Sequence, residues 1–85
     1  MNERKLSKGG FEDIFPEVIH KILVSENPDS IAVAAGLTKR QWDCISHYLD
    51  DPKIEKIAEE LHLNRPNVYY HLSQGFSKLE RLRRK

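Results

Sequence analysis

The chain has little of several features that define other classes of protein. A single cysteine, Cys44, excludes an internal disulfide and fits a reducing cytoplasm. The longest uninterrupted apolar run, Ile31 to Ala35, is far shorter than the about 20 residues that a helix needs to span a bilayer. The start, MNERKLSKGG, is charged and lacks the apolar core of a secretory signal. We therefore expect a cytoplasmic protein without a membrane partner.

Strand patterns are missing as well. At 85 residues the chain is near the lower limit for a self-sufficient hydrophobic core, so we expect a single domain. Its apolar residues recur at helical spacing, and no stretch alternates apolar and polar residues as strands do. We predict an all-α fold, a small bundle of about five helices that contains a helix-turn-helix. Residues 1–10 are predicted to form a flexible leader with a Gly9-Gly10 hinge, and residues 11–85 the folded domain.

The first predicted helix, residues 11–24, carries a wide apolar stripe. Asp13 is its expected N-cap, which places Pro16 in the first turn. The stripe consists of Phe11, Ile14, Phe15, Val18, Ile19, Ile22 and Leu23. Part of it suffices for the core of a small domain, so we expect the rest to hold a homodimer, with Phe11 and Phe15 at outer positions. The alternative is that the whole stripe closes the core of a monomer.

Three shorter patterns predict helices in the middle of the chain. Asn27 followed by proline marks a helix start, and Gly36 stands where helices end. Thr38 and Gln41 form a capping box that opens the next helix. Asp51 is the expected cap of the helix after that.

Residues 53–79, KIEKIAEELHLNRPNVYYHLSQGFSKL, predict two helices joined by a tight turn at residues 62–64. Asn64 is the expected cap of the second helix, which can continue to about Leu82. The apolar positions of the two helices are Ile54, Ile57, Ala58, Leu61, Val68, Leu72, Phe76 and Leu79. This layout is how a small domain places one helix in the major groove of DNA.

The polar residues of this segment fit DNA. Asn or Gln can bond adenine in two places, Arg can do the same to guanine, and tyrosine rings can cover thymine methyls. Base contacts are expected from Asn64, Arg65, Asn67, Tyr69, Tyr70, Ser73 and Gln74. Phosphate contacts are expected from Thr38, Lys39, Arg40, Lys53, Lys56 and Lys78, together with the terminal arginines.

Charge is distributed unevenly along the chain. Residues 1–64 hold 8 Lys and Arg against 12 Asp and Glu, net −4. Residues 65–85 hold 6 against 1, net +5, which together give the overall +1. A basic segment that begins at the predicted reading helix marks where a polyanion would lie. A solvated basic tail is the alternative explanation.

A second segment, residues 31–45, repeats the helix-turn-helix spacing at an offset of 26 residues. Its second helix carries Asp43 and Asp50 on the outer face. Carboxylates that face a phosphate backbone are penalised, so we favour the later segment as the reader of DNA.

From Leu37 to Leu79 the chain resembles the DNA-binding domain of LuxR-type regulators and, less closely, region four of bacterial sigma factors. The matching pieces are LTKR at residues 37–40, IAEELHL at 57–63, VYYHL at 68–72 and the Lys-Leu pair at 78–79. The resemblance implies a four-helix domain whose third helix reads the major groove, with Tyr69, Tyr70 and Ser73 touching DNA. Two positions depart from the family pattern, since His62 replaces the turn glycine and Tyr69 replaces a lysine. We expect any dimer to use a surface other than the family's fourth helix.

The chain offers little for catalysis or metal binding. Its only soft ligands are His20, His47, His62, His71 and Cys44, and no two pairs of them have zinc spacing. A Gly-rich phosphate loop and a nucleophile with its base are both missing. We therefore expect no enzyme activity, no metal and no cofactor.

These patterns predict a sequence-specific DNA-binding transcriptional regulator that reads the major groove with the helix starting near Arg65. Its expected partners are double-stranded DNA and a second copy of the chain. The alternative is a protein-interaction module, a mimic of sigma region four that binds RNA polymerase or another regulator.

Overall fold

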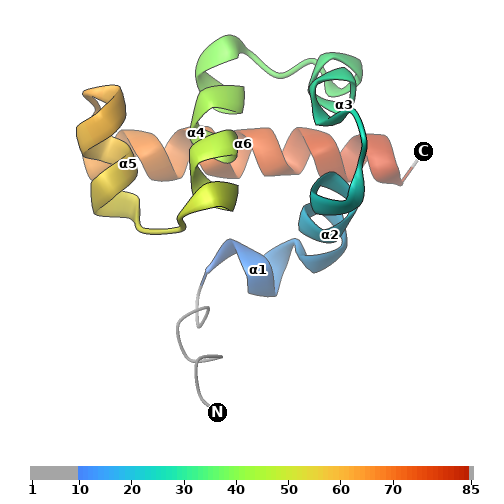
Figure 1. The fold of residues 1–85 in the computed structure, drawn as a ribbon, viewed down its shortest axis with the longest axis horizontal. Coiled ribbons are helices and arrows are strands. Elements are labelled where there is room, and N and C mark those ends of the chain that lie inside the picture. The colour runs from blue at the N-terminus through green and yellow to red at the C-terminus, as the bar shows by residue number, and fades with distance from the viewer. Residues whose placement is uncertain (1–9, 85) are drawn as a thin grey trace.

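The computed structural model describes residues 10–84, and within that range the chain forms six helices and no strand (Figure 1). The helices are α1 (Phe11–Ile14), α2 (Pro16–Val24), α3 (Pro28–Ala35), α4 (Lys39–Asp50), α5 (Ile54–Leu61) and α6 (Arg65–Arg83). The predicted all-α fold is confirmed. The predicted leader lies outside the described residues except for Gly10, which is the N-cap of α1.

Helix α6 is the longest element, with 19 residues, and the other helices gather along it (Figure 1). Helix α4 crosses it, and α2, α3 and α5 also pack against it. Its apolar stripe supplies Val68, Leu72 and Phe76, none of which has any exposed surface. Burial of large apolar side chains is the dominant favourable contribution to folding, so this stripe organises the domain.

Aromatic side chains from both ends of the chain meet over α6. The ring of Phe76 lies 5.4 Å from that of Phe11, 5.6 Å from that of Phe15 and 5.9 Å from that of Tyr48, between centroids. The Tyr48 hydroxyl donates a hydrogen bond of 2.6 Å to Glu12. The expectation that Phe11 and Phe15 occupy outer positions is therefore wrong, because both pack on the core.

The predicted single helix over residues 11–24 is wrong for a related reason. Phe15 leaves the helical region, with φ −127° and ψ 53°, and Pro16 then begins α2. A proline disfavours helical backbone at the residue before it. Asp13 lies within α1 and is not a cap. The break allows Phe11 and Phe15 to approach the same ring.

Two of the predicted caps are confirmed. Thr38 and Gln41 form both bonds of the capping box, at 3.0 and 3.1 Å. The side chain of Asn64 accepts a 2.9 Å hydrogen bond from the Asn67 amide. The helix end at Gly36 is also as predicted, since its φ of 78° is a left-handed conformation that favours glycine.

One other capping prediction is wrong, and the one at Asn27 is confirmed for the position of the helix start alone. The N-cap of α5 is Lys53, and Asp51 lies before it, accepting a 3.3 Å bond from the Lys53 amide. Asn27 occupies the N-cap position of α3, but its side chain makes no capping bond. Instead, the Ser30 hydroxyl donates to the Asn27 carbonyl at 2.9 Å.

Gly75 is the point of closest approach between α4 and α6. A Cβ atom at this position would lie 2.5 Å from Cδ1 of Ile45, a fully buried side chain. Glycine in a helix interior costs about 1 kcal/mol relative to alanine. The close crossing of α4 over α6 therefore requires a residue that weakens α6 itself.

Gly75→Ala should lower the free energy of unfolding by about 1 kcal/mol, because overpacking of about 1–3 kcal/mol exceeds the gain in helix propensity. In an Ile45→Val background, which lacks Cδ1, the same change should instead raise that free energy by up to about 1 kcal/mol. Urea denaturation of the four proteins measures both values. An equal loss in both backgrounds would contradict the proposed contact.

Candidate nucleic-acid interface

The turn between α5 and α6 determines how α6 leaves α5. His62 adopts a left-handed conformation, with φ 58° and ψ 43°, and is the only non-glycine residue with positive φ in the described range. The Leu63 amide donates a 2.9 Å bond to the Ala58 carbonyl, which closes the turn. Leu63 also packs against the core. A side chain in this conformation costs about 1 kcal/mol, and core packing offsets that cost.

The side of α6 opposite its apolar stripe is covered by no other described helix. Side chains at i, i+4, i+7, i+11 and i+14 share one face of a helix. On α6 this outer row consists of Tyr70, Gln74, Ser77, Arg81 and Arg84, none of them acidic. Over these 14 steps the row is about 21 Å long. Sequence reasoning missed Ser77, although its spacing from Tyr70 and Gln74 would have identified it.

Four of the residues predicted to contact bases lie together on the first half of this face. Asn67, Tyr70, Ser73 and Gln74 are all exposed, and Tyr70 retains 60% of its surface. Tyr69 lies to one side of them, with its ring centroid 6.3 Å from that of Phe11. It is still 51% exposed, so one part of its ring packs while the other faces solvent.

The other two predicted base-contacting residues already have partners. Asn64 is occupied as the cap of α6. Arg65 donates a 3.2 Å bond to Glu55 at the start of α5, and both side chains are mainly exposed. Exposed ion pairs contribute only about 0.2–1 kcal/mol, so a phosphate or a base could replace this carboxylate.

The predicted phosphate-contacting residues fall into two groups. The Arg65–Glu55 pair places the start of α5, with exposed Lys53 and Lys56, beside the first turn of α6. The start of α4, with exposed Thr38, Lys39 and Arg40, lies instead beside the second half of α6. The two groups are separated by about 20 Å along the α6 axis.

Lys78 shows that the start of α4 lies beside the second half of α6, because its side chain bonds two residues of that region. Its ammonium group donates to the Gly36 carbonyl at 3.2 Å and to Oε1 of Gln41 at 3.1 Å. These bonds fasten the α3–α4 turn to α6. We therefore assign Lys78 to this connection and leave it out of the candidate interface.

The basic end of α6 also divides into bound and exposed cations. Arg83 bonds Glu17 at 2.9 Å and Glu80 at 2.8 Å, which fastens α6 to α2. The hydrogen bond to Arg83 lowers the pKa of Glu80, and the same bond raises the pKa of Arg83. Arg81 and Arg84 remain exposed in the outer row.

Buried polar groups lie away from this face. Burial raises the pKa of the Cys44 thiol, which keeps it in the protonated form that neither attacks nor binds metal well. Burial and the bond to Glu12 raise the pKa of Tyr48 far above its usual value. His71 is half-buried, and its Nδ1 atom has no hydrogen-bond partner among residues 10–84.

The described part of the chain holds no group of three or more His, Cys, Asp or Glu side chains that could bind a metal. Nor is any of its helices both long and apolar enough to cross a membrane. Comparisons with protein-family models, curated proteins and solved structures find no match for this chain. The likeness to LuxR-type domains therefore rests on the pattern of residues 37–79.

Proposed function

We propose that the outer face of α6 binds the major groove of double-stranded DNA and that the protein is a sequence-specific transcriptional regulator. The observation that carries this proposal is the composition of the exposed face. Its first half presents Asn67, Tyr70, Ser73 and Gln74, and its second half presents arginines, with no acidic side chain in the outer row. Amides read adenine, tyrosine rings cover thymine methyls, and arginines neutralise phosphates.

The packing of α6 also supports this function. The major groove is about 12 Å wide and admits an α-helix. All the large apolar side chains of α6 except Tyr69 and Tyr70 lie on its packed side, so the helix can enter a groove without uncovering the core. Glu60, on α5, has its carboxylate directed toward α4, where it lies 3.4 Å from Nε2 of His47.

Selection of bound sequences from random duplex DNA tests the proposal directly. We expect enrichment of one short motif, and a repeat of that motif about one helical turn away if two copies bind together. Recovery of unenriched DNA after repeated rounds would contradict sequence-specific binding.

Gln74→Ala and Asn67→Ala should each weaken binding to the selected duplex by about 1–3 kcal/mol, the cost of one lost bidentate base contact. Binding to an unrelated duplex should change little, because phosphate contacts remain. Asn27→Ala is the matched control, since it removes an exposed amide outside the α6 face. Fluorescence anisotropy with both duplexes measures the affinities. Wild-type preference in both α6 variants would show that this face does not read bases.

Arg81→Gln and Arg84→Gln should weaken binding to all duplexes alike, because these residues lie in the phosphate-contacting half of the face. Each should reduce the slope of log K against log salt concentration by about 0.9. Lys21→Gln removes an equal charge from α2 and should leave the slope nearly unchanged. If all three variants keep the wild-type slope, the end of α6 does not contact DNA.

A protein-interaction module that binds RNA polymerase or another regulator is the second candidate function. The same exposed face and the same fold would serve it. Binding to a protein groove need not depend steeply on salt, whereas phosphate contacts produce a steep loss of affinity. A flat salt dependence with no enriched DNA motif would favour this candidate.

We also propose that the protein is a homodimer in solution, since one reading helix covers only a few base pairs. Large apolar side chains are exposed at Ile14 (60%), Leu23 (61%) and Val24 (63%). Sedimentation equilibrium should give twice the 9.9 kDa mass of the chain. The double variant Leu23→Glu/Val24→Glu should sediment with the monomer mass. His20→Glu, at an exposed polar position of α2, should keep the dimer mass. Monomer mass for the wild type at all micromolar concentrations would contradict the dimer.

A further inference from the structure

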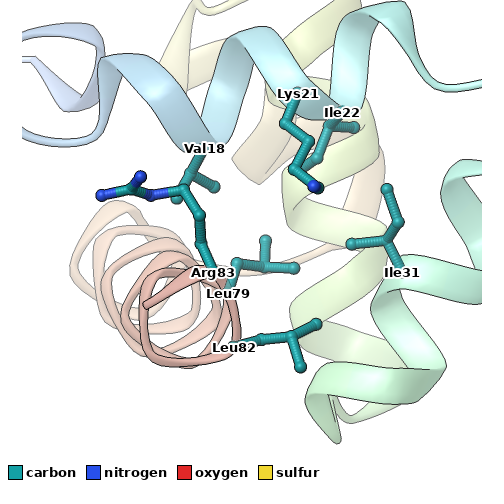
Figure 2. Close-up of a pocket in the computed structure, with 7 residues that line it drawn as sticks. All are labelled: Val18, Lys21, Ile22, Ile31, Leu79, Leu82 and Arg83. Atoms are coloured by element: carbon teal, nitrogen blue, oxygen red, sulfur yellow. The ribbon is translucent and has the colours of Figure 1, made fainter. Parts of the chain in front are cut away.

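A cavity of about 270 Å³ lies between α2, α3 and the second half of α6 (Figure 2). It is separate from the exposed face proposed to bind DNA, because its α6 residues belong to the packed side. Its apolar walls come from Val18, Ile22, Ile31, Leu79 and Leu82. Such a lining favours an apolar ligand body, since burial of apolar surface is its main source of affinity.

Two cationic side chains border this cavity, and they differ in orientation. Figure 2 shows the Lys21 side chain reaching from α2 toward the space between Ile31 and Leu79, with its nitrogen at the end. The stem of Arg83 lines the wall, while its guanidinium group points away from the cavity. Lys21 has no carboxylate within 4 Å among residues 10–84, whereas Arg83 is held by Glu17 and Glu80.

The Arg83 bonds also connect two walls of the site. Arg83 joins Glu17 of α2 to Glu80 of α6 at one edge of the cavity. Small-molecule sites are usually formed before the ligand binds, with apolar walls and few polar groups. The cavity has both properties, with Lys21 as its one cation without a described partner.

We propose that this cavity binds a small amphipathic monoanion, with an apolar body against the walls and a carboxylate on the Lys21 ammonium group. The volume equals roughly nine waters at ~30 Å³ each, which corresponds to a ligand of about ten non-hydrogen atoms. A single available cation favours one negative charge over a phosphate ester or a dicarboxylate. Octanoate has the required size and charge and serves as the probe.

Titration of the folded protein with octanoate, followed through methyl NMR signals, tests the site. We expect saturable shifts at Ile22, Ile31, Leu79 and Leu82 in the millimolar range. Lys21→Gln should weaken octanoate binding by about fivefold, the upper range for an ion pair of an exposed lysine, and leave octan-1-ol binding unchanged. Lys56→Gln, which removes an equal charge on α5, should bind octanoate like the wild type.

Leu82→Trp provides a second variant, because the larger side chain fills the cavity and should abolish binding of both probes. Shifts that do not saturate, or equal octanoate affinity in the wild type and Lys21→Gln, would overturn the proposal. So would shifts of the Ile31, Leu79 and Leu82 methyls, which lie outside α2, on raising the protein concentration without octanoate. That result would show that a second copy of the chain occupies the cavity.

Discussion

The burial of one side of α6 is the constraint on which the rest of the structure depends. Phe76 and Leu72 have no exposed surface, and four other helices pack along the same side. The close crossing of α4 requires Gly75, and the ion pairs of Arg83 attach the far end of α6 to α2. Since every described packing partner lies on this side, the opposite side is left for solvent or for another molecule.

The turn before α6 determines where the exposed side of this helix lies. His62 takes a left-handed conformation where glycine would be unstrained, and Leu63 anchors the turn in the core. The turn and the Asn64 cap together fix where α6 begins. A fixed start matters for reading DNA, because base contacts depend on the placement of side chains within a groove. Rigid support of an exposed polar face is consistent with that task.

Much of this fold could be predicted from the sequence, because its helices obey local rules. The capping box at Thr38, the cap at Asn64 and the glycine at the end of α3 are short-range features, and all are present. The errors arose where tertiary contacts decide the outcome. Periodicity could not show that Phe15 breaks the first helix to reach Phe76. Nor could it show that Lys78 bonds the α3–α4 turn, or that α2, α3 and α6 line a cavity.

The central claim is that the first half of the outer face of α6 contacts DNA. Backbone-amide NMR spectra of the protein with a selected duplex test it most directly, because they report contact residue by residue. We expect the largest shifts at Asn67, Tyr70, Ser73 and Gln74, with small shifts for α2 and α3. Shifts confined to α2 and α3, or no shifts with any duplex, would contradict it.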